Sequence, residues 1–253
     1  MIPTSIDGTD ITGATIDGTD VQEITVDGDV VFSAQVSVPN SVVTLYRFED
    51  SANTNTATDF LGNNDATING PTYTSASKNG QFAIEDSGVF NSGHNVTSNN
   101  TVDLVNTGTA NELTMGGWVR FDQSPDFHAP INYGQTSNDD NLFHIRSDGS
   151  DNWMIFLTIN NNVAFLNNSN PIQIGTYEHV AATLDANQME FYINGNSVGT
   201  QSHNLSLQNL ASGKFRLIQS LRSVEFILDG ALDDVFFANS KLSTSEIRQM
   251  RDL

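Results

Sequence analysis

The loop that begins at Asp59 carries oxygen donors of the kind that bind a hard cation. Asp59 offers a carboxylate and Asn64 an amide oxygen, and Gly62 lies between them. Calcium gathers several such oxygens, and a loop can supply them when a glycine lets it bend sharply. The loop therefore predicts a calcium site. The alternative is that Asp59 and Asn64 only cap turns by accepting backbone N–H groups.

A second set of residues, between positions 127 and 153, combines aromatic rings with amide and carboxylate groups. This mixture suits the recognition of sugars by surface loops. The predicted ligand-binding residues are Phe127, His128, Tyr133, Asn138, Asp139, Asp140, Asn141 and Trp153. Two alternatives stay open: Trp153 belongs to the core, and Asp139-Asp140 forms a solvated turn.

Catalysis by paired carboxylates is not expected. Glycoside hydrolysis needs two carboxyl groups about 5 to 9.5 Å apart. The nearest pair on one face of one expected strand is Glu225 and Asp229, and four strand residues separate them by roughly 13 Å. The five histidines show no catalytic or metal-binding spacing, and no phosphate loop or nucleophile elbow occurs. We therefore predict no catalytic residues and no enzyme activity, although a pair assembled from separate strands stays open.

β-Strands are expected to position these residues. Between 189 and 193 the apolar Met189, Phe191 and Ile193 alternate with Glu190 and Tyr192, which is the pattern of a strand with one buried face. The next two residues, at 194–195, are Asn-Gly, and both tolerate the positive φ of a tight hairpin turn. The chain is expected to reverse there.

Further short apolar runs are separated by loops rich in Asn and Ser, and they too predict strands. They lie at 42–48, 82–84, 142–145, 153–159, 163–166, 215–218 and 224–228. One helix is expected over 244–252, because Ser243 and Glu246 have the spacing of a capping box. This pattern predicts an all-β sandwich with a short C-terminal helix.

Four segments resemble, in order, motifs of the laminin-G-like domains, which have a concanavalin-A-like jelly-roll fold. L-T-M-G-G-W-V-R-F at 113–121 is similar to the family's F-T-I-S-A-W-V-K strand. Y-E-H-V-A at 177–181 and F-Y-I-N-G at 191–195 resemble its W-x-H-V-A and L-Y-V-N-G motifs, with Tyr177 in place of Trp. The segment 230–247 resembles its closing G-x-I-D-D-V to L-S-x-x-E-I signature. The resemblance covers roughly 42–253 and implies a jelly roll, but one fold hosts many functions.

The same resemblance extends the calcium prediction. The segment 59–67 is similar to the family's D-x-S-G-N-G-N-D-A-T loop. In relatives that bind calcium, this loop lies near an Asp of the closing strand, which corresponds here to Asp233. The resemblance therefore implies a site formed by Asp59, Gly62, Asn64 and Asp233. The alternative is that Asp233 holds a backbone N–H group.

The composition narrows the range of partners and settings. The chain of 253 residues has 30 acidic and 10 basic residues, a formal charge of -20 and no cysteine. We expect no nucleic-acid partner, no disulfide and no membrane insertion. The N-terminus lacks a basic start and an apolar run, so no signal peptide is expected. The acidic, Lys-poor composition resembles that of halophilic proteins; an ordinary acidic surface domain that binds calcium is the alternative.

The N-terminal region is a repeat of ten residues. Asp-Gly follows a β-branched residue at 6–8, 16–18 and 26–28, which predicts short strands reversing at each Asp-Gly. So few residues cannot bury enough surface to fold alone. We therefore predict an arm at 1–34 for oligomerisation or docking, a linker at 35–41 and the jelly roll at 42–253. The arm resembles those of structural proteins from tailed viruses of halophilic archaea; a flexible acidic leader is the alternative.

Together these features predict a non-enzymatic virion surface protein. We expect a spike, turret or tail-fibre component that forms a homo-oligomer, contacts other virion proteins through its arm and binds glycans or glycoproteins of the host surface. One alternative is a virion decoration that is purely structural. A second is a lectin-like adhesion domain of a secreted cell-surface protein.

Overall fold

The computed structural model describes part of the chain in detail. The described residues are 5–6, 9–10, 15–16, 19–20, 23–26, 29–33, 37–50, 54–87, 93–105, 111–125, 127–135, 141–210, 212–221 and 227–253. The chain divides into two compact units, Met1–Val38 and Pro39–Leu253. The boundary between the units falls inside the predicted linker at 35–41.

The described residues of the first unit form three two-stranded antiparallel hairpins. They are formed by β1 (Ser5–Ile6) with β2 (Thr9–Asp10), β3 (Thr15–Ile16) with β4 (Thr19–Asp20), and β5 (Glu23–Val26) with β6 (Asp29–Ser33). The Asp-Gly pairs lie between the strands of each hairpin, outside the described residues. The prediction of short strands that reverse at a ten-residue period is confirmed.

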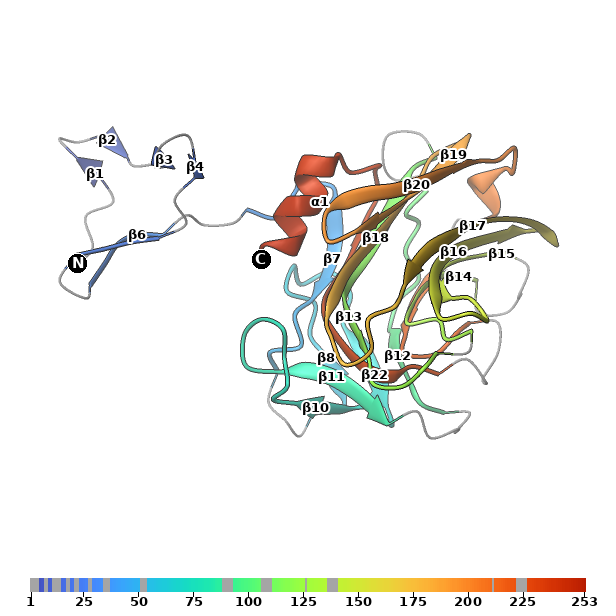
Figure 1. Ribbon diagram of the computed structural model, residues 1–253, viewed down its shortest axis with the longest axis horizontal. Helices are drawn as coiled ribbons and strands as arrows, with labels where there is room; N and C mark the ends of the chain where they lie inside the picture. The colour runs from blue at the N-terminus through green and yellow to red at the C-terminus, as the bar shows by residue number, and fades with distance from the viewer. Residues whose placement is uncertain are drawn as a thin grey trace. The chain divides into compact units, whose positions relative to one another are not determined.

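The second unit is a jelly-roll sandwich of two antiparallel sheets (Figure 1). The first sheet has the order β10-β11-β22-β13-β18-β19-β20, with β7 also paired to β22. Its strands are β7 (Val42–Tyr46), β10 (Thr72–Thr74), β11 (Ala83–Ser87), β13 (Leu113–Phe121), β18 (Glu178–Leu184), β19 (Gln188–Ile193), β20 (Asn196–Ser202) and β22 (Asp229–Ala238).

The second sheet has the order β17-β16-β15-β14-β21-β12-β9-β8. Its strands are β8 (Thr56–Ala57), β9 (Ala66–Asn69), β12 (Asn95–Ser98), β14 (Ile131–Gly134), β15 (Asn141–Ser147), β16 (Asn152–Ile159), β17 (Asn162–Pro171) and β21 (Lys214–Leu217). The predicted all-β sandwich is confirmed. The expected strand at 224–228 lies mostly outside the described residues, and Ile227 forms only an isolated bridge with Gln219.

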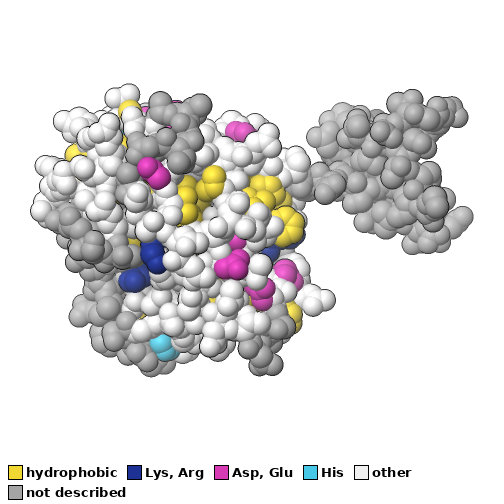
Figure 2. All heavy atoms as spheres, turned by 180° about the vertical axis from the view of Figure 1, so that it is seen from behind, with side chains coloured by type: hydrophobic (Ala, Val, Ile, Leu, Met, Phe, Trp, Pro, Cys, Tyr) yellow, Lys and Arg dark blue, Asp and Glu magenta, His cyan; other side chains and the backbone are white. Residues whose placement is uncertain are grey.

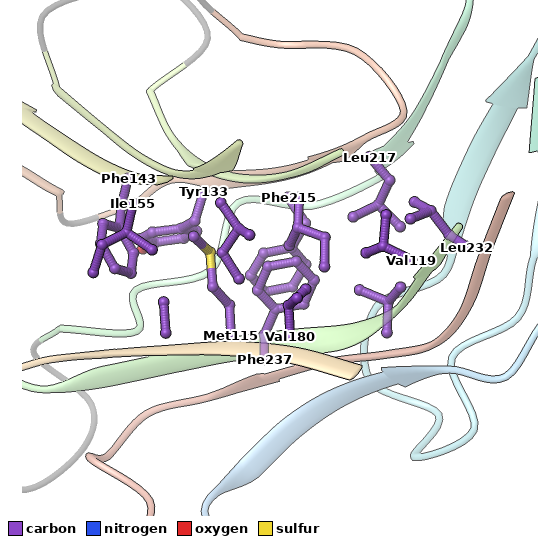
Figure 3. Packing of buried hydrophobic residues seen from close by; sticks show 14 of the residues in the cluster. Met115, Val119, Tyr133, Phe143, Ile155, Val180, Phe215, Leu217, Leu232 and Phe237 are labelled. Carbon is purple, nitrogen blue, oxygen red and sulfur yellow. The ribbon is translucent and has the colours of Figure 1, made fainter. Parts of the chain in front are cut away.

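The core lies between the two sheets (Figure 3). Phe143, Tyr133 and Phe215 from the second sheet face Met115 and Phe237 from the first, and all five side chains are fully buried. The rings of Phe215 and Phe237 stack across the sandwich with their centroids 3.8 Å apart. Alternating apolar residues on strands of both sheets thus form one continuous interior.

The hairpin between β19 and β20 turns at Asn194-Gly195 as predicted. Asn194 has φ of 50° and Gly195 of 76°, the positive values that suit a two-residue turn. Met189, Phe191 and Ile193 belong to the core. Tyr192 points to the opposite face and is nevertheless buried, whereas Glu190 on that face is half-buried.

Helix α1 (Thr244–Arg251) follows the last strand and matches the predicted helix closely. Ser243 accepts a hydrogen bond from the Glu246 N–H, and the Glu246 side chain accepts one from the Ser243 N–H, which is the predicted capping box. Ile247 and Met250 form the buried side of the helix. Among the described residues, no helix is both long and apolar enough to cross a membrane.

Candidate functional site

The candidate site lies on the outward face of β16 and β17. Along β16 the side chains of Trp153, Ile155 and Leu157 enter the core. Alternation along a strand therefore turns Met154 and Phe156 to the other face. Phe156 lies directly opposite Phe165 of β17, and Met154 lies opposite Asn167. Paired residues of neighbouring strands point to the same side, so this face carries two phenyl rings side by side.

A cavity of about 450 Å³ opens over this face, and we call it the aromatic groove. Two of its rings, Phe127 and Phe165, are 40% and 50% exposed, which is unusual for large apolar side chains. The groove is lined by Phe127, Asp148, Gly149, Ser150, Met154, Phe156, Phe165 and Asn167. It therefore offers three phenyl rings, a thioether, an amide, a hydroxyl and one carboxylate to a ligand.

The position of Phe127 is fixed from two sides. Its ring lies close to the backbone at Gly149, where an added Cβ would come within 2.7 Å of the ring Cζ. The Arg146 guanidinium lies 5.2 Å from the centroid of the Phe127 ring and 5.6 Å from that of Phe156, in the range of cation–π attraction. Arg146 is buried and donates to the carbonyl of Ser147 at 3.2 Å. The buried Arg146 guanidinium therefore contacts both rings and stabilises their positions.

The carboxylate in the groove belongs to a tight turn. Asp148 Oδ1 accepts backbone N–H groups from Ser150 at 2.7 Å and Asn152 at 2.9 Å. Burial by itself would raise the pKa of the Asp148 carboxyl, but these N–H groups and the Asn152 amide outweigh it and lower the pKa below its usual value. The groove therefore carries a negative charge at one edge.

Phe127 is the one residue of the predicted ligand-binding set that lines the groove, as far as the described residues show. Trp153 is fully buried, and its Nε1–H donates to Glu178 at 3.0 Å. Tyr133 is fully buried too, and its hydroxyl donates to the carbonyl of Val102 at 2.7 Å. This corrects the predicted set, because a ligand in solution cannot reach either ring. The core alternative holds for Trp153.

The other predicted ligand-binding residues are placed elsewhere. His128 is half-buried, with its ring 6.3 Å from that of Phe121. Asn141 is buried, and its Oδ1 accepts the N–H of Asn160 at 3.1 Å. Asn138, Asp139 and Asp140 lie outside the described residues.

In the predicted calcium loop, the Asp59 carboxylate organises the backbone. Oδ1 accepts the N–H groups of Leu45 and Leu61, and Oδ2 accepts those of Asn63 and Asn64, at 2.9 to 3.1 Å. Gly62 has φ of 76°, which lets the loop turn back on the carboxylate. Four N–H donors around one buried carboxylate leave it no open side for a cation. This is the turn-capping alternative.

Asp233 has the same kind of environment. Its Oδ2 accepts the N–H groups of Lys78 and Asn79, each at 2.9 Å, and its Oδ1 accepts that of Asp234. Burial and then the neighbouring Asp234 charge raise the pKa of Asp233 to about 7, against the N–H bonds, which lower it. As arranged, the two carboxylates do not fit a calcium ion. No group of three or more metal-binding His, Cys, Asp or Glu residues occurs in the described part of the chain. Calcium binding by the chain stays a prediction, which calorimetric titration with calcium chloride tests.

The carboxylates considered for catalysis do not form a described pair. Glu225 lies outside the described residues. Asp229 begins β22, where burial and then the charges of Asp122, Asp86 and Glu85 raise its pKa. Repulsion among these like charges explains the direction of the shift.

Sequence reasoning missed Phe156, Phe165, Met154 and Asn167. A signal was present, since the residues at 163–166 are Val-Ala-Phe-Leu, all apolar. In a strand with one solvent-exposed face, apolar and polar residues are expected to alternate. In the structure Val163 and Phe165 are about half exposed. The apolar run is unbroken because it includes these two residues of the solvent-exposed face.

Comparison with known proteins agrees with this architecture. Residues 90–248 match the family model described as the concanavalin A-like lectin/glucanases superfamily. No curated protein matches the sequence of the chain significantly.

Solved structures with a similar fold have low sequence identity. Domain 4 of AbnA, a GH43 extracellular arabinanase from Geobacillus stearothermophilus, in complex with arabinotriose, has a TM-score of 0.65 and 18% identity, covering 83% of this chain and 98% of that one. The binding domain of Paraclostridial Mosquitocidal Protein 1 has a TM-score of 0.61 and 13% identity, covering 83% of this chain and 52% of that one. Trypanosoma rangeli sialidase has a TM-score of 0.62 and 16% identity, covering 92% of this chain and 36% of that one. This chain thus spans about half the length of the second structure and about a third of the third.

At these identities the structural likeness establishes the fold alone. The family model, however, spans well over half of the chain, and its fold is the two-sheet sandwich that carries the aromatic groove. The chain belongs to the concanavalin A-like lectin/glucanases superfamily.

Proposed function

We propose that the unit Pro39–Leu253 is a carbohydrate-recognition domain that binds its ligand in the aromatic groove. The observation that carries this proposal is the set of three phenyl rings, Phe127, Phe156 and Phe165, around one cavity of about 450 Å³. Aromatic faces with a few polar groups suit sugars, which have apolar C–H faces and hydroxyl edges. The likeness to AbnA domain 4, described in complex with arabinotriose, supports the same ligand class.

The proposed role is binding without catalysis. Asp148 is the one carboxylate among the described residues that line the groove, and it already accepts two backbone N–H groups. Hydrolysis of a glycosidic bond uses two carboxyl groups on opposite sides of that bond. Incubation with the oligosaccharides that bind is therefore expected to release no new reducing ends.

The proposed setting is the surface of a virion. In this proposal the arm docks on other virion proteins or assembles a homo-oligomer, and the jelly roll contacts glycans or glycoproteins of the host surface. The strongly acidic composition and the ten-residue repeat of the arm support this setting. Several copies displayed together would strengthen a weak contact. A purely structural decoration and an adhesion domain of a secreted cell-surface protein are the alternatives.

Calorimetric binding to a panel of oligosaccharides, starting with arabinotriose, tests the site. Phe165→Ala is expected to weaken binding roughly threefold to tenfold, since it removes one stacking ring. Phe60→Ala is the matched control, because Phe60 is 61% exposed and lies outside the groove. Both side chains are exposed, so neither change should unfold the chain. Failure of the whole panel to bind, or equal binding by Phe165→Ala, would contradict the proposal.

A further inference from the structure

A second cavity lies apart from the aromatic groove, where the turn between β16 and β17 meets the segment 204–209. Its volume is about 280 Å³, and we call it the amide cavity. It is lined by Ile159, Asn160, Asn162, Asn204, Leu205, Ser206 and Asn209. The two cavities share no lining residue.

One wall of the amide cavity is a rigid hairpin turn. Asn160 and Asn161 have φ of 49° and 64°, the values of a two-residue turn that matches the twist of its strands. The paired residues Ile159 and Asn162 close the turn. Buried Asn141 also fixes it, because its Oδ1 accepts the Asn160 N–H at 3.1 Å. The wall is therefore preformed.

The opposite wall is anchored by the 3-10 helix η1 (Leu207–Leu210), whose two leucines are buried. Before the helix, the Leu205 N–H donates to His203 Nδ1 at 3.2 Å, and the His203 N–H donates to the Asn187 carbonyl at 2.8 Å. Asn204, Ser206 and Asn209 project from this anchored segment into the lining.

The polar groups of the amide cavity are available to a ligand. The side chains of Asn160, Asn204, Ser206 and Asn209 line the cavity; the first three residues are exposed, and Asn209 is half-buried. None of the four makes a side-chain hydrogen bond to another described residue, so each is solvated. Each carboxamide can donate and accept, and so can the hydroxyl.

This chemistry selects a class of ligand. An apolar ligand would strip water from the three carboxamides without replacing its hydrogen bonds. A charged ligand would meet no opposite charge there, because none of the described residues that line the cavity is ionisable. A sugar hydroxyl both donates and accepts and therefore matches an amide. Ile159 and Leu205 add apolar surface for the C–H groups of a sugar ring.

We propose that the amide cavity is a second saccharide-binding site, which takes one uncharged sugar residue by hydrogen bonding. The cavity is smaller than the aromatic groove, and none of its described lining residues is aromatic, so it binds through directional contacts instead of stacking. Together with the aromatic groove, and resting on the function proposed for it, each chain then holds two sugars of a glycan-coated surface. This adds avidity without an added subunit.

The test is an NMR titration that follows the side-chain NH₂ signals of uniformly ¹⁵N-labelled full-length protein. The probes are arabinose, glucose and N-acetylglucosamine, with galacturonate as the charged comparison. We expect the NH₂ signals of Asn160, Asn204 and Asn209 to shift with at least one neutral sugar. Galacturonate is expected to cause smaller shifts at the same concentration.

Two variants assign the effect to the cavity. The double change Asn204→Ala and Asn209→Ala is expected to weaken this binding about tenfold, since it removes two neutral hydrogen-bonding groups. Asn170→Ala is the matched control, because Asn170 is an exposed asparagine of β17 outside the lining. Asn204 and Asn170 are exposed and Asn209 is half-buried, so the fold is expected to persist, and the backbone spectrum checks this.

The result can be separated from that for the aromatic groove. In Phe165→Ala the shifts at the amide cavity are expected to persist even where groove binding is lost. Absence of shifts at the three asparagines with every neutral sugar would overturn the proposal. Equal affinity in the double variant, or equal shifts with galacturonate, would overturn it too.

Discussion

At the scale of single residues, the site depends on what surrounds each side chain. Phe127 is held over the groove because Gly149 leaves room for its ring and Arg146 lies beneath it. Asp59 and Asp233 are surrounded by backbone N–H groups and serve as internal caps. From the sequence alone, carboxylates at these positions predict metal ligands. The groups that surround each carboxylate in the structure decide its role.

The change Gly149→Ala is expected to weaken oligosaccharide binding several-fold while leaving stability nearly unchanged. The new Cβ would lie 2.7 Å from the Phe127 ring, and the ring is the part able to move away. Calorimetric affinity and the thermal midpoint measure the two effects. Gly199→Ala is the control, because its Cβ would meet Leu166 at an ordinary 3.4 Å. Undiminished binding in Gly149→Ala would show that the position of Phe127 does not matter.

A pH prediction concerns His179, which is fully buried between Trp118 and Phe236. Neither ring nitrogen has a hydrogen-bond partner among the described residues. Burial, and to a lesser extent the Arg251 charge, lowers the pKa of His179 to about 3. Below its unfolded pKa of about 6.5, the unfolded chain binds a proton that the folded chain does not. Stability from this group is therefore complete above pH 6.5 and declines as the pH falls toward 3.

The variant His179→Leu removes this titration. Between pH 7 and pH 4 the native chain is expected to lose more unfolding free energy than the variant, by up to roughly 3 kcal/mol. Urea unfolding at both pH values measures the difference. Parallel loss in both proteins would mean that protonation of His179 does not oppose folding.

At the scale of elements, the hairpin β19–β20 and helix α1 stabilise one another. Arg248 Nε donates to the carbonyl of Gly195 and Arg251 Nη1 to that of Asn194, each at 3.0 Å. The turn carbonyls thus bind two cations from the last turn of the helix, where cations also complement the helix dipole. Thr244, the first residue of the helix, also hydrogen-bonds with the side chain of Tyr192.

The matched variants Gly195→Ala and Gly175→Ala measure this coupling. Both glycines have left-handed φ, 76° and 72°, so each alanine is expected to cost about 1 kcal/mol in backbone strain. A Cβ at Gly195 would also lie 2.8 Å from the Arg248 side chain, whereas a Cβ at Gly175 would have no neighbouring atom within 4 Å. We expect a larger loss of unfolding free energy in Gly195→Ala. Equal losses in denaturant unfolding would show that the contact with the helix adds nothing.

At the scale of the whole molecule, the chain combines a net charge of -20 with two structural units. Figure 2 shows acidic side chains beside exposed hydrophobic ones on one face of the molecule. Such charge repels itself at low ionic strength, and salt screens the repulsion. Measurements of assembly therefore belong in concentrated salt as well as in dilute buffer.

Removal of residues 1–38 tests the arm. If the arm assembles the protein, light scattering in concentrated potassium chloride is expected to give a defined oligomer for the full chain. The shortened chain Pro39–Leu253 is expected to be a monomer. If both the full and the shortened chain are monomers, the result would favour docking of the arm on a different protein, and with it the decoration or adhesion-domain alternatives. If both chains form oligomers with the same number of subunits, the subunit interface lies within the jelly roll.

Local sequence signals predicted most of the fold. Asn194-Gly195 specified a hairpin, and Ser243 with Glu246 specified the start of α1, because turns and caps are formed by residues close in sequence. The strand at 113–121 was predicted through the family resemblance, with the bounds of β13. The site was predicted less well. Of the described residues that line the groove, only Phe127 belongs to the predicted ligand-binding set. Trp153 and Tyr133 were included in that set although they are buried, because their burial depends on strands that lie far away in the sequence.

The sequence by itself determined an all-β sandwich, its hairpins, its terminal helix and its acidic character, because alternation, turn residues, caps and charge are local or additive properties. The tertiary structure alone decided which face of each strand is open. It exposed Phe165, buried Trp153, and surrounded Asp59 and Asp233 with N–H donors. A period of two assigns residues to two faces, but only the long-range packing of two sheets decides which face becomes the core and which becomes the site.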